Sequence, residues 1–259
     1  MKQSVFEKIY LAFILLLMYV PMVLVVVYSF NQSRISTVWG GFSFDWYVKL
    51  FSNREMGQAL KNSLIIAGLC SVISAFIGTV CAVGIHKSRT AIDRGVKRLA
   101  GVPLMMPEII SGLLFLLIFS FLGIKLGVGS IVLAHCSFCI PYVYMNVSSA
   151  FEGVDESTLE AARDLGAGRL RTFFEITVPQ LMPGIISGAL LSFAMSMDDV
   201  VISFFVTGPG TNTLPIKIYS QLRKGVTPEV NALCSIMLLV SILIVAAAAF
   251  AGKKRNPHT

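Results

Sequence analysis

Long apolar stretches restrict the fold of this chain more than any other feature of its sequence. Six of them are long enough to cross a membrane as helices, since the hydrocarbon core is about 30 Å thick. Lipid offers the backbone no hydrogen-bonding partners, so each stretch must satisfy its own amides, which favours α-helices. The alternating segments that typify membrane β-barrels are absent from the sequence. The predicted helices are 9–29, 62–85, 99–121, 130–149, 182–205 and 231–251.

The composition supports the same class of protein. Hydrophobic residues make up 55% of the 259 residues, charged residues 14%, and the mean hydropathy is +0.77, outside the range of soluble domains. Lys2 and Lys8 resemble the start of a secretory signal, but the apolar run after them is long and lacks a small-residue cleavage site. We therefore predict an all-α membrane protein with six transmembrane helices, and we take residues 1–259 as one transmembrane domain.

The lysines and arginines between the stretches predict the orientation. With a cytoplasmic N-terminus, 13 of the 21 lysine and arginine residues lie inside the cell, and five of these lie in the short segment 86–98. Positive charge close to helix ends is retained in the cytoplasm, so we expect both termini there. The net charge of +7 is then mainly a topology signal. No basic patch with interleaved aromatic residues suggests nucleic acid, which leaves membrane lipids as the surroundings.

The five cysteines all fall within the predicted helices. An odd, membrane-buried set does not form a disulfide framework. His135, Cys136 and Cys139 form a string that could bind a metal or carry redox chemistry. No second ligand pair exists in the sequence, and cysteine packs as a small hydrophobe where helices meet, so we favour packing and assign no metal.

The longest predicted cytoplasmic loop, residues 150–181, has the pattern of an ordered segment. Apolar residues recur at helical spacing on both sides of Gly166, which suits the left-handed end of a helix. Pro179 should end the second helical pattern. We expect a short helix, a glycine turn and another short helix. This arrangement alone fits a structured connector equally well.

The residue identities in this loop carry a more specific signal. Their fixed spacing resembles the EAA loop, the segment with which ABC importer permeases dock into a groove of the ATPase subunit. Val178 departs from the family pattern, which more often has leucine there, but it keeps the apolar character. The matching residues are Glu160, Ala161, Ala162, Gly166, Ile176 and Pro179.

A second resemblance covers nearly the whole chain. The stretches SMDDVVISFFVTGPG, LPIKIYS and KGVTPEVNAL, together with YSFNQS, are similar to the permeases of spermidine/putrescine ABC transporters of the PotC type. The resemblance implies a type I ABC importer fold in the bacterial cytoplasmic membrane. It also implies three partners: a homologous second permease, an ATPase dimer and an extracytoplasmic polyamine-binding protein.

The sequence contains no catalytic constellation. It has no G-x-x-x-x-G-K-[ST] phosphate loop, and its histidines, His86, His135 and His258, are scattered rather than paired with a nucleophile. We therefore predict that the chain is not an enzyme and holds no cofactor. ATP and Mg²⁺ would bind the partner ATPase, as the resemblance implies.

Two adjacent aspartates, Asp198 and Asp199, interrupt the fifth apolar stretch. A charge facing lipid at the bilayer centre costs about 2.5–3.5 kcal/mol on insertion scales, so these groups should face something else. If 182–205 is one helix, Asp199 lies on a stripe of small and polar residues. Asp198 lies around the helix from it, where it flanks the same cavity, faces the partner permease or lies under the outer surface. The stripe is Gly188, Ser192, Ser196, Asp199 and Ser203.

Two further acids are candidates for the same path. Glu108 lies beside Pro103 and Pro107, and a helix broken inside a membrane is tolerated mainly where it meets protein or a water-filled cavity. An interhelical hydrogen bond is the structural alternative for such an acid. Glu229 follows Pro228 at the outer start of the last stretch, where an acid in the first helical turn is also sufficiently explained by helix capping.

The chemistry of a polyamine fits these acids. Polyamines are flexible methylene chains with ammonium groups, so a path for them needs separated carboxylates and apolar or aromatic walls. Two other functions remain open: an ABC permease for a different cationic or small solute, and an ion-coupled carrier or channel. The residues expected to form the substrate path are Asp199, Asp198, Glu108, Glu229, Ser196 and Tyr142.

Overall fold

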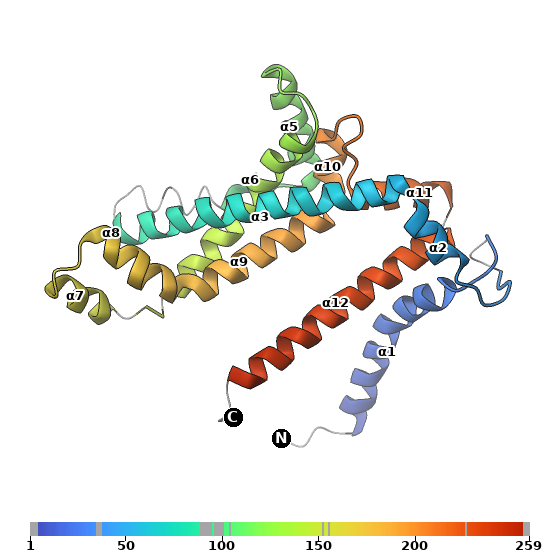
Figure 1. The fold of residues 1–259 in the computed structure, drawn as a ribbon, viewed down its shortest axis with the longest axis horizontal. Coiled ribbons are helices and arrows are strands. Elements are labelled where there is room, and N and C mark those ends of the chain that lie inside the picture. The colour runs from blue at the N-terminus through green and yellow to red at the C-terminus, as the bar shows by residue number, and fades with distance from the viewer. Residues whose placement is uncertain are drawn as a thin grey trace. The chain divides into compact units, whose positions relative to one another are not determined.

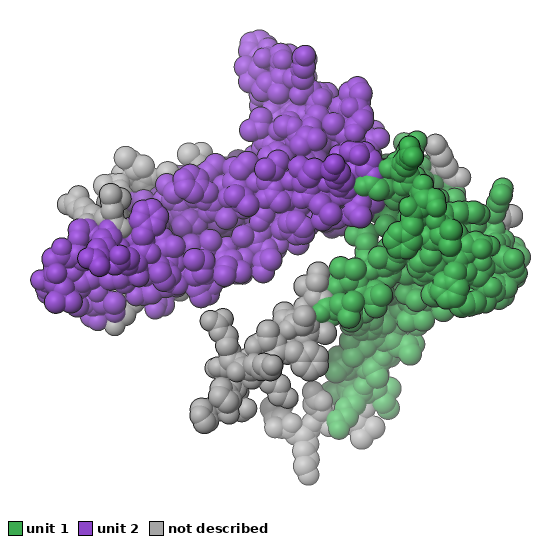
Figure 2. Space-filling view, in the orientation of Figure 1, with its two compact units in different colours: residues 1–57, 218–259 green, residues 58–217 purple. Residues whose placement is uncertain are grey.

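The computed structural model describes residues 5–34, 38–88, 95, 101–103, 105–151, 153–154, 156–225 and 227–255. Within these ranges the chain is helical, apart from loops and one isolated β-bridge between Asn31 and Phe42 (Figure 1). Contacts divide it into two compact units, residues 1–57 with 218–259, and residues 58–217 (Figure 2). The single domain expected from the sequence stays a prediction.

The first unit holds three helices together with one end of α3 (Arg54–Ser88) and one end of α11 (Leu214–Lys224). α12 packs against both α1 and α2. Trp46 on α2 anchors the segment after α1, because its indole Nε1 donates a hydrogen bond to the carbonyl of Asn31 at 2.8 Å. No residue in the most apolar stretch of α1 is buried within the protein, as suits a helix surrounded by lipid. The three helices are α1 (Val5–Tyr28), α2 (Asp45–Ser52) and α12 (Pro228–Arg255).

The second unit is built around α6 (Val128–Phe151), which packs against α5 (Glu108–Phe121), α9 (Val178–Asp198) and α10 (Val201–Val206). α6 and α9 approach closely because α9 presents glycines to α6. A Cβ on Gly184 would lie 2.9 Å from the carbonyl oxygen of Asn146, and one on Gly188 would lie 3.0 Å from Val143 Cα. Small residues four apart allow this approach between membrane helices.

Among the described residues, four helices are long and apolar enough to cross a membrane. Two shorter apolar helices, Glu108–Phe121 and Pro228–Leu243, coincide with the third and sixth predicted stretches. Part of the third stretch, 99–121, lies outside the described residues. The all-helical, multi-pass class is confirmed, and the count of six spans stays a prediction. The four long helices are Phe6–Tyr28, Arg54–Ile85, Val128–Phe151 and Phe173–Asp198.

The predicted continuous helix 182–205 is wrong at its end. α9 stops at Asp198, Asp199 has an extended backbone with φ −66° and ψ 124°, and α10 begins at Val201. The Asp199 carboxylate accepts hydrogen bonds from the backbone amides of Ile202 and Ser203, at 3.3 and 2.7 Å. Aspartate competes in this way with the helical backbone and starts a new helix instead of continuing the old one.

The loop 150–181 contains the predicted helix, glycine turn and helix. α7 (Glu156–Asp164) is followed by Gly166, whose φ of +81° lies in the left-handed region, and then by α8 (Arg169–Thr172). Glycine adopts this conformation without the steric cost that a Cβ adds.

The prediction that Pro179 ends the second helix is wrong. A π-helical turn, η1 (Phe173–Thr177), joins α8 to α9 without a break, and Pro179 lies in the first turn of α9. In this wider turn the amide of Val178 bonds to the carbonyl of Phe173, five residues back. Proline is tolerated in a first turn, and π turns adjust the hydrogen-bond ladder around such positions.

Candidate functional site

A cavity of 440 Å³ lies in the second unit. Its walls come from the segment before α5, from α5 and α6, and from both sides of the break between α9 and α10. Pockets for small ligands occupy about 300–1,000 Å³, so the cavity is large enough for one. Its polar lining residues are Glu108, Ser111, Ser137, Tyr142, Asp198 and Asp199.

The cavity is acidic and has apolar walls. Glu108, Asp198 and Asp199 bring three carboxyl groups to it, and no lysine, arginine or histidine occurs among its described lining residues. Phe115 and Phe138 belong to the apolar lining, with methionine and valine side chains beside them. Carboxylates attract cations, and aromatic faces add cation–π attraction while also covering methylene groups. The arrangement therefore suits an organic cation.

The break before α5 places Glu108 at the cavity. Pro107 is the N-terminal cap residue of α5, with φ −58° and ψ 132°, and Glu108 is the first residue of the helix. The interruption predicted at the prolines is therefore present. A carboxylate in the first turn interacts favourably with the positive end of the helix dipole. Ser111 lines the same cavity, whereas Gly112 is buried and packs against Phe205.

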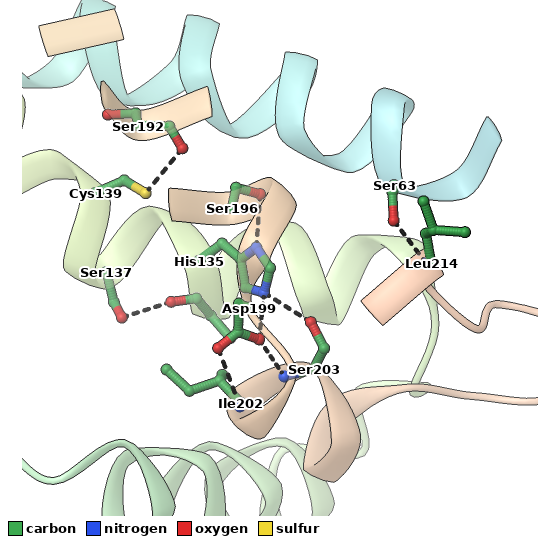
Figure 3. Close-up of polar contacts among 11 residues, drawn as sticks. Ser63, His135, Ser137, Cys139, Ser192, Ser196, Asp199, Ile202, Ser203 and Leu214 are labelled. Carbon is green, nitrogen blue, oxygen red and sulfur yellow. Dashed lines mark hydrogen bonds and ion pairs between the residues drawn. The ribbon is translucent and has the colours of Figure 1, made fainter. Parts of the chain in front are cut away.

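Asp199 is held by His135 of α6 (Figure 3). The side chain of His135 is fully buried and that of Asp199 is 6% exposed. His135 Nε2 lies 3.2 Å from Asp199 Oδ2 and 2.9 Å from Ser203 Oγ, and Nδ1 lies 2.7 Å from Ser196 Oγ. We assign the proton to Nε2, because a carboxylate only accepts hydrogen bonds. Nδ1 then accepts the hydrogen bond of the Ser196 hydroxyl.

The stripe seen in the sequence is a packing seam rather than an open polar track. Gly188, Ser192 and Ser196 are buried, and the glycine packs directly against Val143 of α6. The thiol of Cys139 on α6 donates to the Ser192 carbonyl oxygen at 3.6 Å (Figure 3). Asp199 avoids lipid as expected, but it does so because the helix breaks and His135 binds it.

The structure brings together four of the six residues expected on the path. Glu108, Tyr142, Asp198 and Asp199 line one cavity, so of the placements considered for Asp198, the one beside the same cavity holds. Ser196 lies behind the wall, where it bonds to His135. Glu229 belongs to the other unit, where its Oε1 accepts from the Asn53 side chain at 2.6 Å.

His135 contacts the site, but the sequence does not identify it as a partner of Asp199. The sequence places it in a possible metal or redox string and among scattered histidines, and its partners lie 61 to 68 residues away along the chain. One signal was available: an ionisable side chain inside a membrane helix is costly and needs a specific partner. The adjacent aspartates in another predicted helix are such partners.

The cysteines behave as the packing interpretation predicts. Cys70, Cys136 and Cys139 are buried in the main apolar cluster of the second unit, and the sulfur atoms of Cys70 and Cys136 lie 3.9 Å apart. No group of three or more histidine, cysteine or acidic side chains that could hold a metal ion occurs among the described residues.

The EAA-like residues lie along α7, the glycine turn, η1 and the start of α9. Ala161 and Pro179 are exposed, Ile176 is half-buried, and Ala162 is buried. The side chain of Glu160 lies outside the described residues. The loop also exposes two large apolar side chains, Leu165 at 88% and Phe174 at 65%. Exposed apolar residues of this kind are typical of contact surfaces.

Together these elements define a helical membrane protein with an acidic internal cavity. The chain belongs to the family described as binding-protein-dependent transport system inner membrane component, whose sequence model matches residues 74–255.

The relatives are transport permeases. The spermidine/putrescine transport system permease protein PotC of Haemophilus influenzae is 38% identical over 239 residues, which cover 92% of this chain and 93% of PotC. The putrescine transport system permease protein PotI of Escherichia coli K12 is 44% identical over 228 residues, 85% of this chain and 81% of PotI.

Solved structures share the fold. The bacterial alginate ABC transporter in complex with an alginate pentasaccharide-bound periplasmic protein contains a chain that matches with a TM-score of 0.74 at 17% identity. The match covers 98% of this chain and 95% of that chain. The type of fold expected from the sequence, that of an ABC importer permease, is therefore confirmed.

Proposed function

We propose that this chain is the transmembrane permease subunit of an ATP-driven ABC importer for polyamines, of the spermidine and putrescine class, and that it forms half of the translocation pathway. The observation that carries the proposal is the cavity with three carboxylates and aromatic walls, in a chain related to permeases named for putrescine. The ammonium groups would approach Glu108 and Asp198, and Phe115, Phe138 and Tyr142 would cover the methylenes.

The proposed assembly follows from the same relatives. The chain would pair with a homologous second permease, an ATPase dimer that binds ATP and Mg²⁺, and an extracytoplasmic polyamine-binding protein. It would cross the bacterial inner membrane six times with both termini in the cytoplasm, which is the orientation that its lysines and arginines favour. The permeation site needs only weak binding, because a substrate must also leave it.

The proposed coupling element is the loop 150–181, with Glu160, Ala161, Ala162, Gly166, Ile176 and Pro179 as docking residues. The exposed Leu165 and Phe174 offer apolar contacts for the ATPase. Movement of the ATPase would reach α9 directly, because α8, η1 and α9 follow one another without a loop. A rigid connection of this kind suits transmission of a rocking motion between subunits.

Substitution of Gly166 tests the coupling role. Space around it is open, so the effect of a new side chain comes from the φ of +81°. Gly166→Val should distort the turn, at a cost of about 1–2 kcal/mol, and lower both ATPase co-purification and uptake. Gly166→Asn should retain both, because asparagine tolerates this conformation. Full uptake by Gly166→Val, with normal membrane levels, would contradict docking through this turn.

Uptake of labelled putrescine and spermidine, in a strain without other polyamine uptake systems, tests the substrate. The wild-type chain with its partners should restore uptake, and Asp198→Asn and Glu108→Gln should each lower it about tenfold, as expected when a charge-assisted contact is lost. Asp45→Asn is the matched control, since Asp45 lies in the other unit. Absence of wild-type uptake, or normal uptake by both cavity variants, would refute the proposal.

A further inference from the structure

His135 is a buried ionisable residue that neither the proposed substrate contacts nor the coupling loop uses. It lies within α6 with no exposed surface, where a polar ring is stable only if its nitrogens are bonded. Both ring nitrogens are bonded, and none of the three bonds is to its own helix (Figure 3). The ring therefore joins α6 to something specific.

The residues that it joins are the two sides of the helix break. Ser196 belongs to the last turn of α9, Asp199 is the extended residue of the break, and Ser203 belongs to α10. Asp199 in turn accepts from the amides of Ile202 and Ser203, so the carboxylate that His135 holds also forms the start of α10. One imidazole thus fixes the end of α9, the break and the beginning of α10.

The break decides which residues follow Asp198 at the cavity wall. Asp198, the last residue of α9, is exposed and lines the cavity, and Asp199 lines it as well, although its side chain turns toward His135 and is 6% exposed. Val201 and Ile202, the first residues of α10, line the cavity beyond the break. A continuous helix would carry α10 on in line with α9, so this part of the wall depends on the break.

We propose that His135 is a positioning residue for transport: by holding Asp199 it maintains the α9–α10 break, and with it the cavity wall that Val201 and Ile202 form beside Asp198. His135 makes no contact with the substrate and acts through Asp199. The effect on transport rests on the proposed function, whereas the effect on the break does not.

Hydrogen exchange in the purified complex tests the break, whatever the transported solute is. His135→Leu should speed exchange of the peptide containing the Ile202 and Ser203 amides by about tenfold or more, because their carboxylate acceptor loses its support. His135→Gln, whose amide can still donate to Asp199, should exchange like the wild type. Cys139→Ala is the control, because Cys139 also bonds α9 from α6 but not at the break.

Uptake of labelled putrescine then tests the link to transport. His135→Leu should lower uptake about tenfold, His135→Gln should retain most of it, and adding His135→Leu to Asp199→Asn should cause no further loss, since the residues act as one unit. If His135→Leu is absent from the membrane, His135→Asn replaces it, because the asparagine side chain is too short to reach Asp199.

Each outcome bears on the proposal. Unchanged exchange in His135→Leu, or equal acceleration in Cys139→Ala, would refute the positioning role. If the double variant lost uptake by the product of the two single-variant factors, His135 would not act through Asp199. Absence of polyamine uptake by the wild type would refute the proposed substrate alone, and the exchange result would still decide the role of His135.

Discussion

Asp198 and Asp199 are neighbours in the sequence but have different surroundings. The sequence places Asp199 on the stripe of small and polar residues and leaves three surroundings open for Asp198. In the structure Asp199 is 6% exposed and accepts bonds from His135 and from two backbone amides. Asp198 is exposed at the cavity. The buried carboxylate is suited to hold structure and the exposed one to meet a cation, so we propose different roles for two residues that line the same cavity.

Two serines on the face of α9 that packs against α6 differ in the hydrogen bonding of their hydroxyl groups. The hydroxyl of Ser192 is buried without a hydrogen-bond partner among the described residues, whereas that of Ser196 bonds to His135. Ser196→Ala should lower stability by about 1–3 kcal/mol, because it leaves a buried ring nitrogen unpaired, and Ser192→Ala should be neutral or stabilising. Melting temperatures of the purified complexes would measure this. A lower melting temperature for Ser192→Ala than for Ser196→Ala would contradict it.

At the scale of elements, the helical periodicity of the sequence identified the right face of α9 but not what covers it. The face with Gly188, Ser192 and Ser196 packs against α6, because small residues allow the backbones to approach. The break at Asp199 was not predictable from hydropathy, since residues 182–205 are apolar on both sides of it. It depends on local bonds from a carboxylate and on a histidine 64 residues away.

The close approach of α6 and α9 leads to a prediction about the glycines of α9. A Cβ added to Gly184 would lie 2.6 Å from Ala150 Cβ and 2.9 Å from the backbone oxygen of Asn146, whereas a Cβ on Gly68 of α3 meets nothing within 4 Å. Gly184→Ala should therefore force α6 and α9 apart and cost about 1–3 kcal/mol. Gly68→Ala should be neutral or stabilising, since alanine favours helix.

Thermal unfolding of the two purified variants, compared with the wild type, would measure the difference. Equal melting temperatures for the two glycine variants would show that α9 can shift at this seam without cost.

At the scale of the whole molecule, the sequence predicted the class, the family and the helical form of the loop 150–181, because hydropathy and a fixed motif are local properties. It also named all three acids that the structure places at the cavity. Their convergence could not be derived, because Glu108 lies on α5 and Asp198 on α9, and the two reach one cavity only through the packing of α5, α6, α9 and α10. His135 was missed for the same reason.

The orientation of the chain in the membrane can be tested on either side of α6. This helix has 24 residues, a length of about 36 Å, which is enough to cross the hydrocarbon core. Lys125 before it and Leu165 after it are both exposed, so cysteines placed there should react wherever reagent reaches them. We expect Lys125 to lie outside the cell and Leu165 in the cytoplasm.

Single cysteines at these positions, in a chain whose native cysteines are replaced by serine or alanine, would be treated with a membrane-impermeant maleimide. Lys125→Cys should be labelled in intact cells, and Leu165→Cys only after the membrane is permeabilised. The opposite pattern would reverse the orientation and place the coupling loop away from any cytoplasmic ATPase. Labelling of both positions in intact cells would show that α6 does not span the membrane, because of the two helices between them, α6 and the short α7, α6 is the one long enough to cross it.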